Sequence, residues 1–276
     1  MSEQFINLTI DNIEKEHLCC AISDKKHQVG VATKKNWLRE RIAEGHIFRK
    51  LDEKGKVFIE YAPLETAWVP VHGDNYLYIY CLWVAGSFKG KGYAKSLIEY
   101  CINDAKEKGK AGVCVLSSKK KKPFLTDKKF LLKYGFEVVD TVKDEYELLA
   151  LSFNGEKPYF SETVKEMKIS SEELTIYYGL QCPYIPNCIE QVQEYCTKNK
   201  IPFHLIAVDS LEKAKNHYRA NTYALLIAGK NGTAKKVTNR KLKWRDSYLN
   251  QNIGRIRTFG SLNTVGKQSD RESIRF

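Results

Sequence analysis

Residues 82–110 have the sequence LWVAGSFKGKGYAKSLIEYCINDAKEKGK, in which an apolar run, a glycine-rich loop and a helical pattern follow one another. The apolar run belongs to a β-branched and aromatic stretch that predicts a strand. After the loop, apolar residues recur at helical spacing, and Gly109 follows as a stop signal. The stretch therefore predicts a strand, a tight loop and an amphipathic helix.

The loop itself has the composition of a phosphate-binding loop. Gly90 and Gly92 permit backbone conformations that a Cβ atom forbids, so consecutive amides can point into one concavity. The helix that starts at Ala94 adds its positive end. Positive charge comes from three lysines, Lys89, Lys91 and Lys95. A plain structural turn is the alternative interpretation of the same residues.

Around this loop, the pattern predicts a mixed α/β unit that ends near Phe153. Capping residues predict a helix over 11–22, and apolar spacing predicts another over 34–45. Three successive strands, a helix, a strand, a helix and two strands follow, at 46–52, 56–71, 75–84, 94–109, 111–117, 126–136, 137–142 and 146–153.

A second unit is expected after a polar linker at 154–172. Strand patterns at 174–180, 202–209 and 222–229 alternate with helical patterns at 186–200 and 210–219. A strand–helix–strand order of this length implies a parallel pair. The expected divisions are residues 1–153, 154–172 and 173–237, and a weakly ordered basic extension, 238–276.

Composition limits the class of protein. The chain has 276 residues, 43% of them apolar, and no apolar run approaches the roughly 18–20 residues that span a bilayer. The N-terminus lacks the pattern of a secretion signal, so we expect a cytoplasmic protein without a membrane partner. The eight cysteines have no CxxC pairing, so we expect thiols and no metal site.

The charge lies mostly at the C-terminus. The net charge is +12, and residues from Lys235 onward contribute 11 basic and 3 acidic side chains, or +8. Such a tail attracts polyanions without sequence preference. We therefore expect no nucleic-acid partner beyond nonspecific contacts of the tail.

The segment from Lys89 to Ala94 resembles motif A of the GNAT acetyltransferases: Gln or Arg, any two residues, Gly, any residue, then Gly or Ala. Lysine stands here at the first position. The resemblance covers roughly residues 1–153 and implies acetyl-CoA as the acyl donor. It implies that backbone amides of Lys89, Gly90, Lys91, Gly92, Tyr93 and Ala94 hold the pyrophosphate, and that backbone groups of Leu82, Trp83 and Val84 hold the pantetheine arm.

The catalytic residues do not follow from the resemblance. Where many family members carry a tyrosine acid, this chain has Leu131, and where a glutamate base is frequent, it has Tyr78. The remaining candidates are Glu60, Glu65, His72, Tyr80 and Tyr134, each of which has an ordinary structural role as its alternative. Catalysis by proximity alone is a further alternative.

The second unit carries Cys182 between a strand and a helix, where thioredoxin-like folds place a reactive cysteine. Cys188 follows after five residues instead of two, so this is not a standard dithiol site. A GNAT domain followed by such a unit resembles the YoaP-type acetyltransferases. The two cysteines could be structural, a redox switch, an acceptor-handling thiol or a metal-binding pair.

The sequence thus predicts a GNAT mixed sheet flanked by helices, followed by a smaller thioredoxin-like α/β domain and a basic tail. The predicted function is transfer of an acetyl group from acetyl-CoA to an amine on a small molecule or peptide. The alternative is a thiol- or redox-handling protein whose GNAT domain only senses acyl-CoA.

Overall fold

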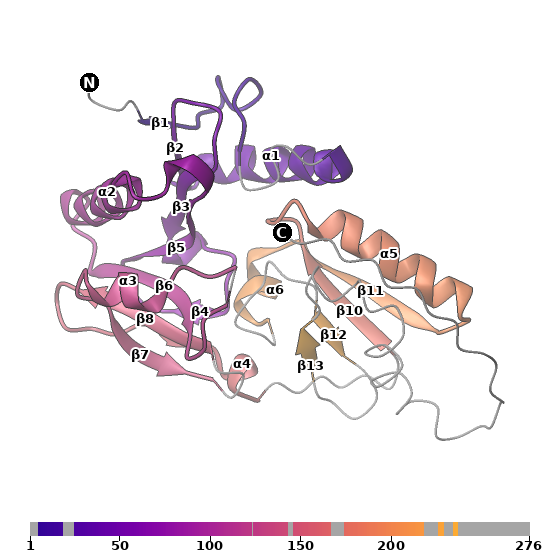
Figure 1. Cartoon of the computed structure of the whole chain (residues 1–276). Helices are drawn as coiled ribbons and strands as arrows, with labels where there is room; N and C mark the ends of the chain where they lie inside the picture. The colour runs from indigo at the N-terminus through magenta and orange to yellow at the C-terminus, as the bar shows by residue number, and fades with distance from the viewer. Residues whose placement is uncertain are drawn as a thin grey trace. The chain divides into compact units, whose positions relative to one another are not determined.

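The computed structural model describes residues 5–18, 25–122, 124–142, 146–166, 174–217, 226–228 and 234–236 (Figure 1). Residues 1–242 form one compact unit and residues 243–276 another, and the second lies wholly outside the described residues. The predictions about the basic extension, Cys19 and Cys20 therefore concern residues outside the described ranges. None of the described helices is long and apolar enough to cross a bilayer.

Figure 1 labels the helices and strands. The strands are β1 Phe5–Asn7, β2 Ile47–Leu51, β3 Val57–Pro63, β4 Val71–His72, β5 Tyr76–Val84, β6 Gly112–Ser118, β7 Glu137–Thr141, β8 Tyr146–Ser152, β9 Tyr159–Phe160, β10 Leu174–Gly179, β11 Phe203–Val208, β12 Leu226–Ala228 and β13 Ala234–Lys236. The α-helices are α1 Gln28–Ile42, α2 Tyr93–Glu107, α3 Lys128–Leu132, α4 Glu162–Glu166, α5 Ile185–Lys198 and α6 Leu211–Lys215. Three short 3-10 turns are η1 Lys25–His27, η2 Leu64–Thr66 and η3 Gly86–Phe88.

The larger sheet has seven strands in the order β1-β2-β3-β5-β6-β8-β7. Only β5 and β6 run parallel, because α2 connects them as a crossover, and every other neighbouring pair is antiparallel. The predicted mixed sheet flanked by helices is therefore confirmed.

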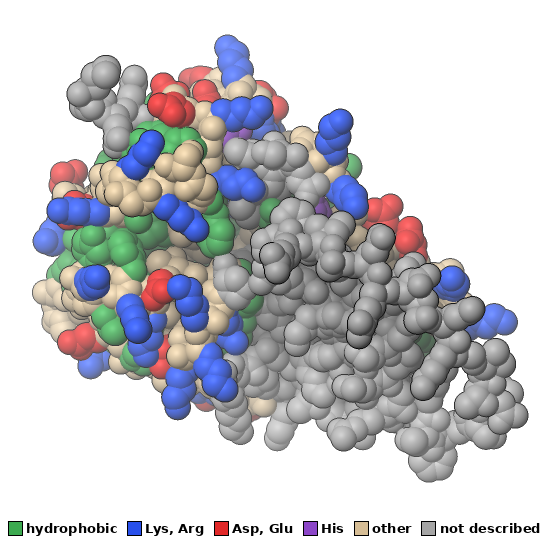
Figure 2. All heavy atoms as spheres, viewed as in Figure 1, with side chains coloured by type: hydrophobic (Ala, Val, Ile, Leu, Met, Phe, Trp, Pro, Cys, Tyr) green, Lys and Arg blue, Asp and Glu red, His purple; other side chains and the backbone are tan. Residues whose placement is uncertain are grey.

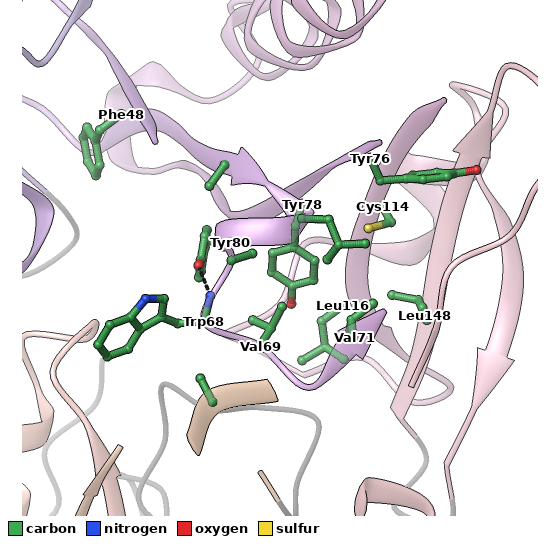
Figure 3. Close-up of a cluster of buried hydrophobic side chains, with 14 of the residues drawn as sticks. Phe48, Trp68, Val69, Val71, Tyr76, Tyr78, Tyr80, Cys114, Leu116 and Leu148 are labelled. Carbon is green, nitrogen blue, oxygen red and sulfur yellow. Dashed lines mark hydrogen bonds between the residues drawn. The ribbon is translucent and has the colours of Figure 1, made fainter. Parts of the chain in front are cut away.

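Alternation along β5 divides the core between two faces of this sheet. Tyr76, Tyr78 and Tyr80 lie in the cluster that includes residues of α1, and part of that cluster is drawn in Figure 3. Leu77 and Ile79 lie in the other cluster, with the apolar face of α2. A strand that is apolar on both faces requires cover on both sides, and the two helices supply it.

The prediction of a helix over 11–22 is wrong for the residues that the structure describes there. Residues 10–15 form turns, in which Ile13 is fully buried. The Asn12 side chain reaches back to accept from the Thr9 amide, and the Ile13 amide donates to the Thr9 carbonyl, so the chain closes a capped turn that does not continue as a regular helix. The next helix, α1, also begins six residues earlier than the expected Lys34.

A second sheet contains four strands in the order β11-β10-β12-β13. Strands β10 and β11 are parallel and the other pairs antiparallel, which confirms the predicted parallel pair. The expected linker at 154–172 contains β9, which pairs with β4, and α4. Phe160 and Val164 from these elements are buried in the α1-side core.

Charged side chains show no single basic stripe on the face drawn in Figure 2. Among the residues coloured there, lysine and arginine side chains are scattered, with acidic side chains between them. On this face, the described residues thus lack the continuous basic track that binds a nucleic-acid backbone.

Candidate active site

The central feature of the larger sheet is an opening between β5 and β6. The two strands pair only from Tyr76 to Ile79 and from Gly112 to Val115. Beyond that, β5 continues to Val84 along β3, and β6 continues to Ser118 along β8. Two strand edges thus diverge, and backbone groups on such edges need partners, so the opening suits an extended ligand.

A β-bulge lies where the opening begins. Cys81 is opposite Glu60 and Ile79 is opposite Tyr61, so Tyr80 is an extra residue on β5. A bulge bends its strand and increases the twist, which turns β5 away from β6. The Tyr80 hydroxyl is anchored on the α1 side, where it accepts a hydrogen bond from the Trp68 amide at 2.7 Å (Figure 3).

The loop after β5 has the open cradle that its glycines predict. Gly86, Gly90 and Gly92 have φ angles of 64°, 79° and 85°, and a Cβ atom on any of them would meet nothing within 4 Å. Gly92 caps α2, and the first intrahelical bond runs from the Ser96 amide to its carbonyl. The preceding amides therefore lack acceptors within the helix and carry its partial positive charge.

Aromatic packing beneath the backbone of this loop holds its two ends against the sheet, through Phe88 and Tyr93. The buried Tyr93 ring lies 6.0 Å from the Phe5 ring and 6.0 Å from the Phe88 ring, centroid to centroid. The β2–β3 turn approaches so closely that a Cβ on Gly55 would lie 2.5 Å from Phe88. The Tyr93 side chain is thus a core anchor, and only its backbone is available to a ligand.

The loop lysines differ in how free they are. Lys89 and Lys91 are exposed, and the Lys91 Nζ lies 5.7 Å from the centre of the Phe88 ring. The Lys95 Nζ lies 3.8 Å from Glu99 on the next turn of α2. Lys89 and Lys91 are therefore the better placed cations for an anionic ligand.

The predicted cofactor residues lie on one continuous path. Leu82, Trp83 and Val84 pair with β3 on one side, and their other side lies along the opening. The path then enters the loop from Lys89 to Ala94. The residues thus form a strand edge that is followed by a cradle of backbone amides. That these residues bind a cofactor stays a prediction.

On the α1 side of the bulge lies a buried ionic network. The Lys34 ammonium donates to both oxygens of the Glu60 carboxylate, at 2.7 and 2.8 Å, and the His46 Nε2 lies 3.0 Å from Oε1. All three residues are at most 3% exposed. The Lys34 charge, together with the His46 hydrogen bond, outweighs desolvation and lowers the pKa of Glu60 to about 2. Glu60 therefore stays ionised near pH 7, and both of its carboxylate oxygens already accept hydrogen bonds within the network.

His46 has a different character, because burial lowers its pKa below the usual 6.5 and keeps the ring neutral near pH 7. Its ring centre lies 5.0 Å from that of Tyr80 and 5.2 Å from that of Trp37. A neutral imidazole that donates from Nε2 to Glu60 keeps Nδ1 as an acceptor. Burial opposes protonation of that nitrogen, and the Glu60 carboxylate favours it.

A loop of the second sheet covers this network. Lys34 also donates to the Gln181 carbonyl at 2.9 Å, and the Gln181 side-chain amide donates to the Trp68 carbonyl at 3.1 Å. A Cβ on Gly30 of α1 would lie 1.9 Å from the Pro183 carbonyl oxygen, so the contact requires glycine.

The remaining sequence candidates lie elsewhere. Glu65 accepts from the Asn75 amide at 2.6 Å, and His72 packs against Tyr159. Tyr134 packs against Phe130 beside the α2-side core. The structure brings Glu60 and Tyr80 together with His46, but it does not bring Glu65, His72 or Tyr134 to them.

Position 131 also belongs to the core. Leu131 is fully buried in the α2-side cluster, among the residues that close α3 against the sheet. The place that holds a tyrosine in many family members therefore supplies packing here and no proton donor.

The cysteine pair of the second unit has one buried member. Cys182 is half-buried in the loop before α5, and Cys188 is buried within α5. Burial raises the pKa of the Cys188 thiol to about 12, so it stays protonated near neutral pH. All six described cysteines are free thiols.

Sequence reasoning missed Lys34 and His46. Lys34 looks like one of several lysines on an exposed helix, and His46 looks like a turn residue after Gly45. The sequence offers one indication: Lys34 and His46 each lie next to an apolar segment, and burying a charge there without a partner would cost folding free energy.

Comparison with known proteins agrees with this geometry. Residues 10–136 match the model of the acetyltransferase (GNAT) family. The uncharacterized N-acetyltransferase YoaP of Bacillus subtilis strain 168 is 42% identical over 213 residues, which are 76% of this chain and 85% of the relative. The chain belongs to the GNAT acetyltransferase family. The family predicted from the loop is thereby confirmed.

Solved structures of GNAT proteins are also similar. PaiA N-acetyltransferase from Thermoplasma acidophilum, in complex with coenzyme A, is 16% identical with a TM-score of 0.39 and covers 55% of this chain and 100% of its own. A GNAT acetyltransferase from Brucella melitensis, in complex with acetyl-CoA, is 13% identical with a TM-score of 0.36, covering 58% and 95%. The thioredoxin-like character predicted for residues 173–237 is not tested by these relatives and stays a prediction.

Proposed function

We propose that this GNAT acetyltransferase transfers an acetyl group from acetyl-CoA to an amine at the opening between β5 and β6. The observation that carries the proposal is the loss of pairing after Ile79 and Val115, which coincides with the bulge at Tyr80. The amide cradle begins at the end of the same strand. The proposed site for the pantetheine arm, along β5, is thus adjacent to the proposed site for the phosphates, in the loop that follows.

The donor is expected to bind mainly through backbone groups. The edge from Leu82 to Val84 pairs with the amides of the pantetheine arm, as a further strand would. The amides from Lys89 to Ala94 hold the pyrophosphate, and the open space over Gly90 and Gly92 admits its oxygens. The bulge leaves backbone at Tyr80 without a partner residue on β3, which suits polarisation of the thioester carbonyl.

The transfer requires a neutral amine and a proton for the thiolate. The amine nitrogen attacks the thioester carbonyl, the C–N bond forms, and the C–S bond breaks to release CoA thiolate. We assign the uptake of the amine proton to His46. Its ring is oriented by Glu60, and the Glu60 carboxylate is in turn held by Lys34. Burial raises the pKa of Tyr80 above its usual 10, so its hydroxyl keeps its proton near pH 7. We assign to it the hydrogen bond that stabilises the departing thiolate, which then takes its proton from water.

The second unit is proposed to be thioredoxin-like and to cover the acceptor side. The strand order β11-β10-β12-β13, with one parallel pair and a helix between its strands, supports this proposal. A thiol-handling role is the weaker alternative, because the buried Cys188 keeps its proton. Cys182→Ser is therefore expected to retain acetyl transfer, and loss of transfer would favour the thiol role.

The donor site is tested with two matched glycine variants. Gly92→Ala and Gly109→Ala each place a Cβ at positive φ in open space, at opposite ends of α2. Both should cost about 1 kcal/mol of stability, but only Gly92→Ala should weaken acetyl-CoA binding in calorimetry. Equal binding by both variants would overturn the donor site.

The proton assignments are tested by steady-state kinetics. His46→Gln and Tyr80→Phe should each lower kcat about 100-fold or more while the affinity for acetyl-CoA is unchanged. Tyr134→Phe is the control and should retain kcat. Full activity of His46→Gln at pH 7 would leave proximity as the mechanism.

A further inference from the structure

At the closed end of the β5–β6 ladder lies a cavity of about 320 Å³. It is lined by Glu65, His72, Asp74, Tyr159 and Lys215, with Leu64 among the other lining residues. Residues 72–74 precede the first residue of β5, and the bulge at Tyr80 lies roughly 13 Å further along that strand at about 3.3 Å per residue. The cavity is therefore separate from the opening described above, and its volume is that of a small-molecule site.

Lys215 places in this cavity a cation that contacts no carboxylate among the described residues, although the Glu65 carboxylate acts on it electrostatically. Its ammonium donates to the carbonyls of Leu64 and Val71, at 2.6 and 2.9 Å. Within the part of the chain that the structure describes, no carboxylate forms an ion pair with it and no third acceptor is present. An ammonium has three donors, so one N–H remains for a ligand.

The other side chains that line the cavity are mainly acidic and aromatic. Glu65 and Asp74 are exposed carboxylates, and one oxygen of Glu65 is bound by the Asn75 amide. The rings of His72 and Tyr159 pack against each other, with their centres 5.7 Å apart and their planes at 32°. Burial lowers the pKa of His72, so it adds no second positive charge near pH 7.

We propose that this cavity is a binding site for a free α-amino acid, whose carboxylate accepts from Lys215 and whose ammonium lies by Glu65 and Asp74. One cation beside two carboxylates disfavours a phosphate, which carries nearly two negative charges, and favours a zwitterion. The remaining volume beside His72 and Tyr159 accommodates a planar or apolar side chain. This site is independent of the proposed transfer mechanism.

The site also bridges two segments that are far apart in the sequence. Lys215 belongs to α6, and its carbonyl acceptors belong to the η2 and β4 region more than 140 residues earlier. A bound carboxylate would complete the coordination of an ammonium that burial otherwise penalises. Binding is therefore expected to stabilise the folded chain.

The test uses the full chain and thermal unfolding with each of the protein amino acids in turn, at about 10 mM. At least one should raise the Tm of the parent and of Lys213→Met, a control on the same helix whose ammonium pairs with Asp209. The Lys215→Met variant should lose about tenfold or more in affinity, as expected for a lost charge-assisted hydrogen bond. The absence of any shift across the set, or equal binding by Lys215→Met, would overturn the proposal.

The pH dependence provides a second readout. The pKa of Lys215 is lowered to about 8 by burial, and the titratable groups that act on it or line its cavity are Glu65, His72, Asp74, Cys114 and Tyr159. Between pH 7 and 9.5, affinity should fall about tenfold or more in the parent. In Lys215→Arg, whose charge persists, only the smaller fall caused by deprotonation of the ligand's own α-ammonium should remain. An unchanged affinity in the parent would contradict the role of Lys215, and Lys215→Arg also serves if Lys215→Met does not fold.

Two single-group probes and one competition complete the test. Acetate should bind weakly and methylammonium more weakly still, because a carboxylate accepts directly from the remaining N–H of Lys215, whereas one oxygen of Glu65 already accepts from the Asn75 amide. The reverse order would contradict the orientation. Saturating acetyl-CoA should leave amino-acid affinity unchanged, whereas direct competition would place the amino acid in the transfer site and overturn the separate site.

Discussion

One added methyl group, in the variant Gly30→Ala of α1, should push the loop that precedes α5 away from the buried network of Lys34, Glu60 and His46. Replacing Gly30 by alanine would put a Cβ 1.9 Å from the Pro183 carbonyl oxygen, a backbone atom. Non-bonded carbon atoms normally stay about 3.5 Å or more away, so the loop must retreat by about 1 Å or more. The hydrogen bond from Lys34 to the Gln181 carbonyl, 2.9 Å long, would then break.

The expected cost follows from the contacts of that loop. The bond from the Lys34 ammonium is worth about 1.5–3 kcal/mol, and the bond from Gln181 to Trp68 is worth about 1 kcal/mol. The edge-to-face pair of His27 and Tyr184, with ring centres 4.5 Å apart, adds about 0.5–1.5 kcal/mol. Alanine in a helix returns about 1 kcal/mol. The net loss of unfolding free energy should be roughly 2–4 kcal/mol, since not every contact is lost completely.

The sign of the change in unfolding free energy distinguishes the two effects of Gly30→Ala. Helix propensity alone predicts that Gly30→Ala stabilises the chain by about 1 kcal/mol, whereas the contact with Pro183 predicts destabilisation. Urea unfolding measures the difference, and Val29→Ala is the control, because Val29 is 73% exposed on the same helix. A stabilised Gly30→Ala variant would refute the docking of this loop on α1.

Four further outcomes are expected from the same geometry. Glu60→Gln should cost about 3–5 kcal/mol at pH 7, because Lys34 stays buried without its charge partner, and Lys34→Met in the same chain should restore part of the loss. The parent should also lose stability as the pH falls from 4.5 towards 2, because the folded-state pKa of Glu60, about 2, lies below its ordinary value, and urea titrations of Glu60→Gln should lack that loss. Gly55→Ala should displace the Phe88 ring and weaken acetyl-CoA about fivefold in calorimetry, for a strain near 1 kcal/mol; unchanged affinity would mean that the ring does not support the loop. The folded-state pKa of Lys215, about 8, lies below its ordinary 10.5, so this group contributes a rise of stability with pH between these values. Buried thiols such as Cys188, whose pKa is raised, contribute a fall, so the Lys215 contribution is measured as the difference in pH slope between the parent and Lys215→Met.

Local signals succeeded where the structure is set by neighbours in the chain. The strand, the glycine loop and α2 follow from residues 76–107, because periodicity and left-handed glycines act within one turn or one strand. The local signal failed at residues 11–18, where capping residues suggest a helix. Burial of Ile13 and Leu18 selects turns there, since packing outweighs a cap worth about 1 kcal/mol.

The sequence by itself determined the family, the mixed sheet and the loop from Lys89 to Ala94, because their signals are periodic and contiguous. Only the tertiary structure decided the bulge at Tyr80 and the pairing of Lys34 with Glu60 and with a carbonyl 147 residues away. Periodicity tells which face of a strand or helix is buried, but it does not tell which charge lies across from which. A buried charge finds its partner only when the sheet, α1 and the loop before α5 have come together.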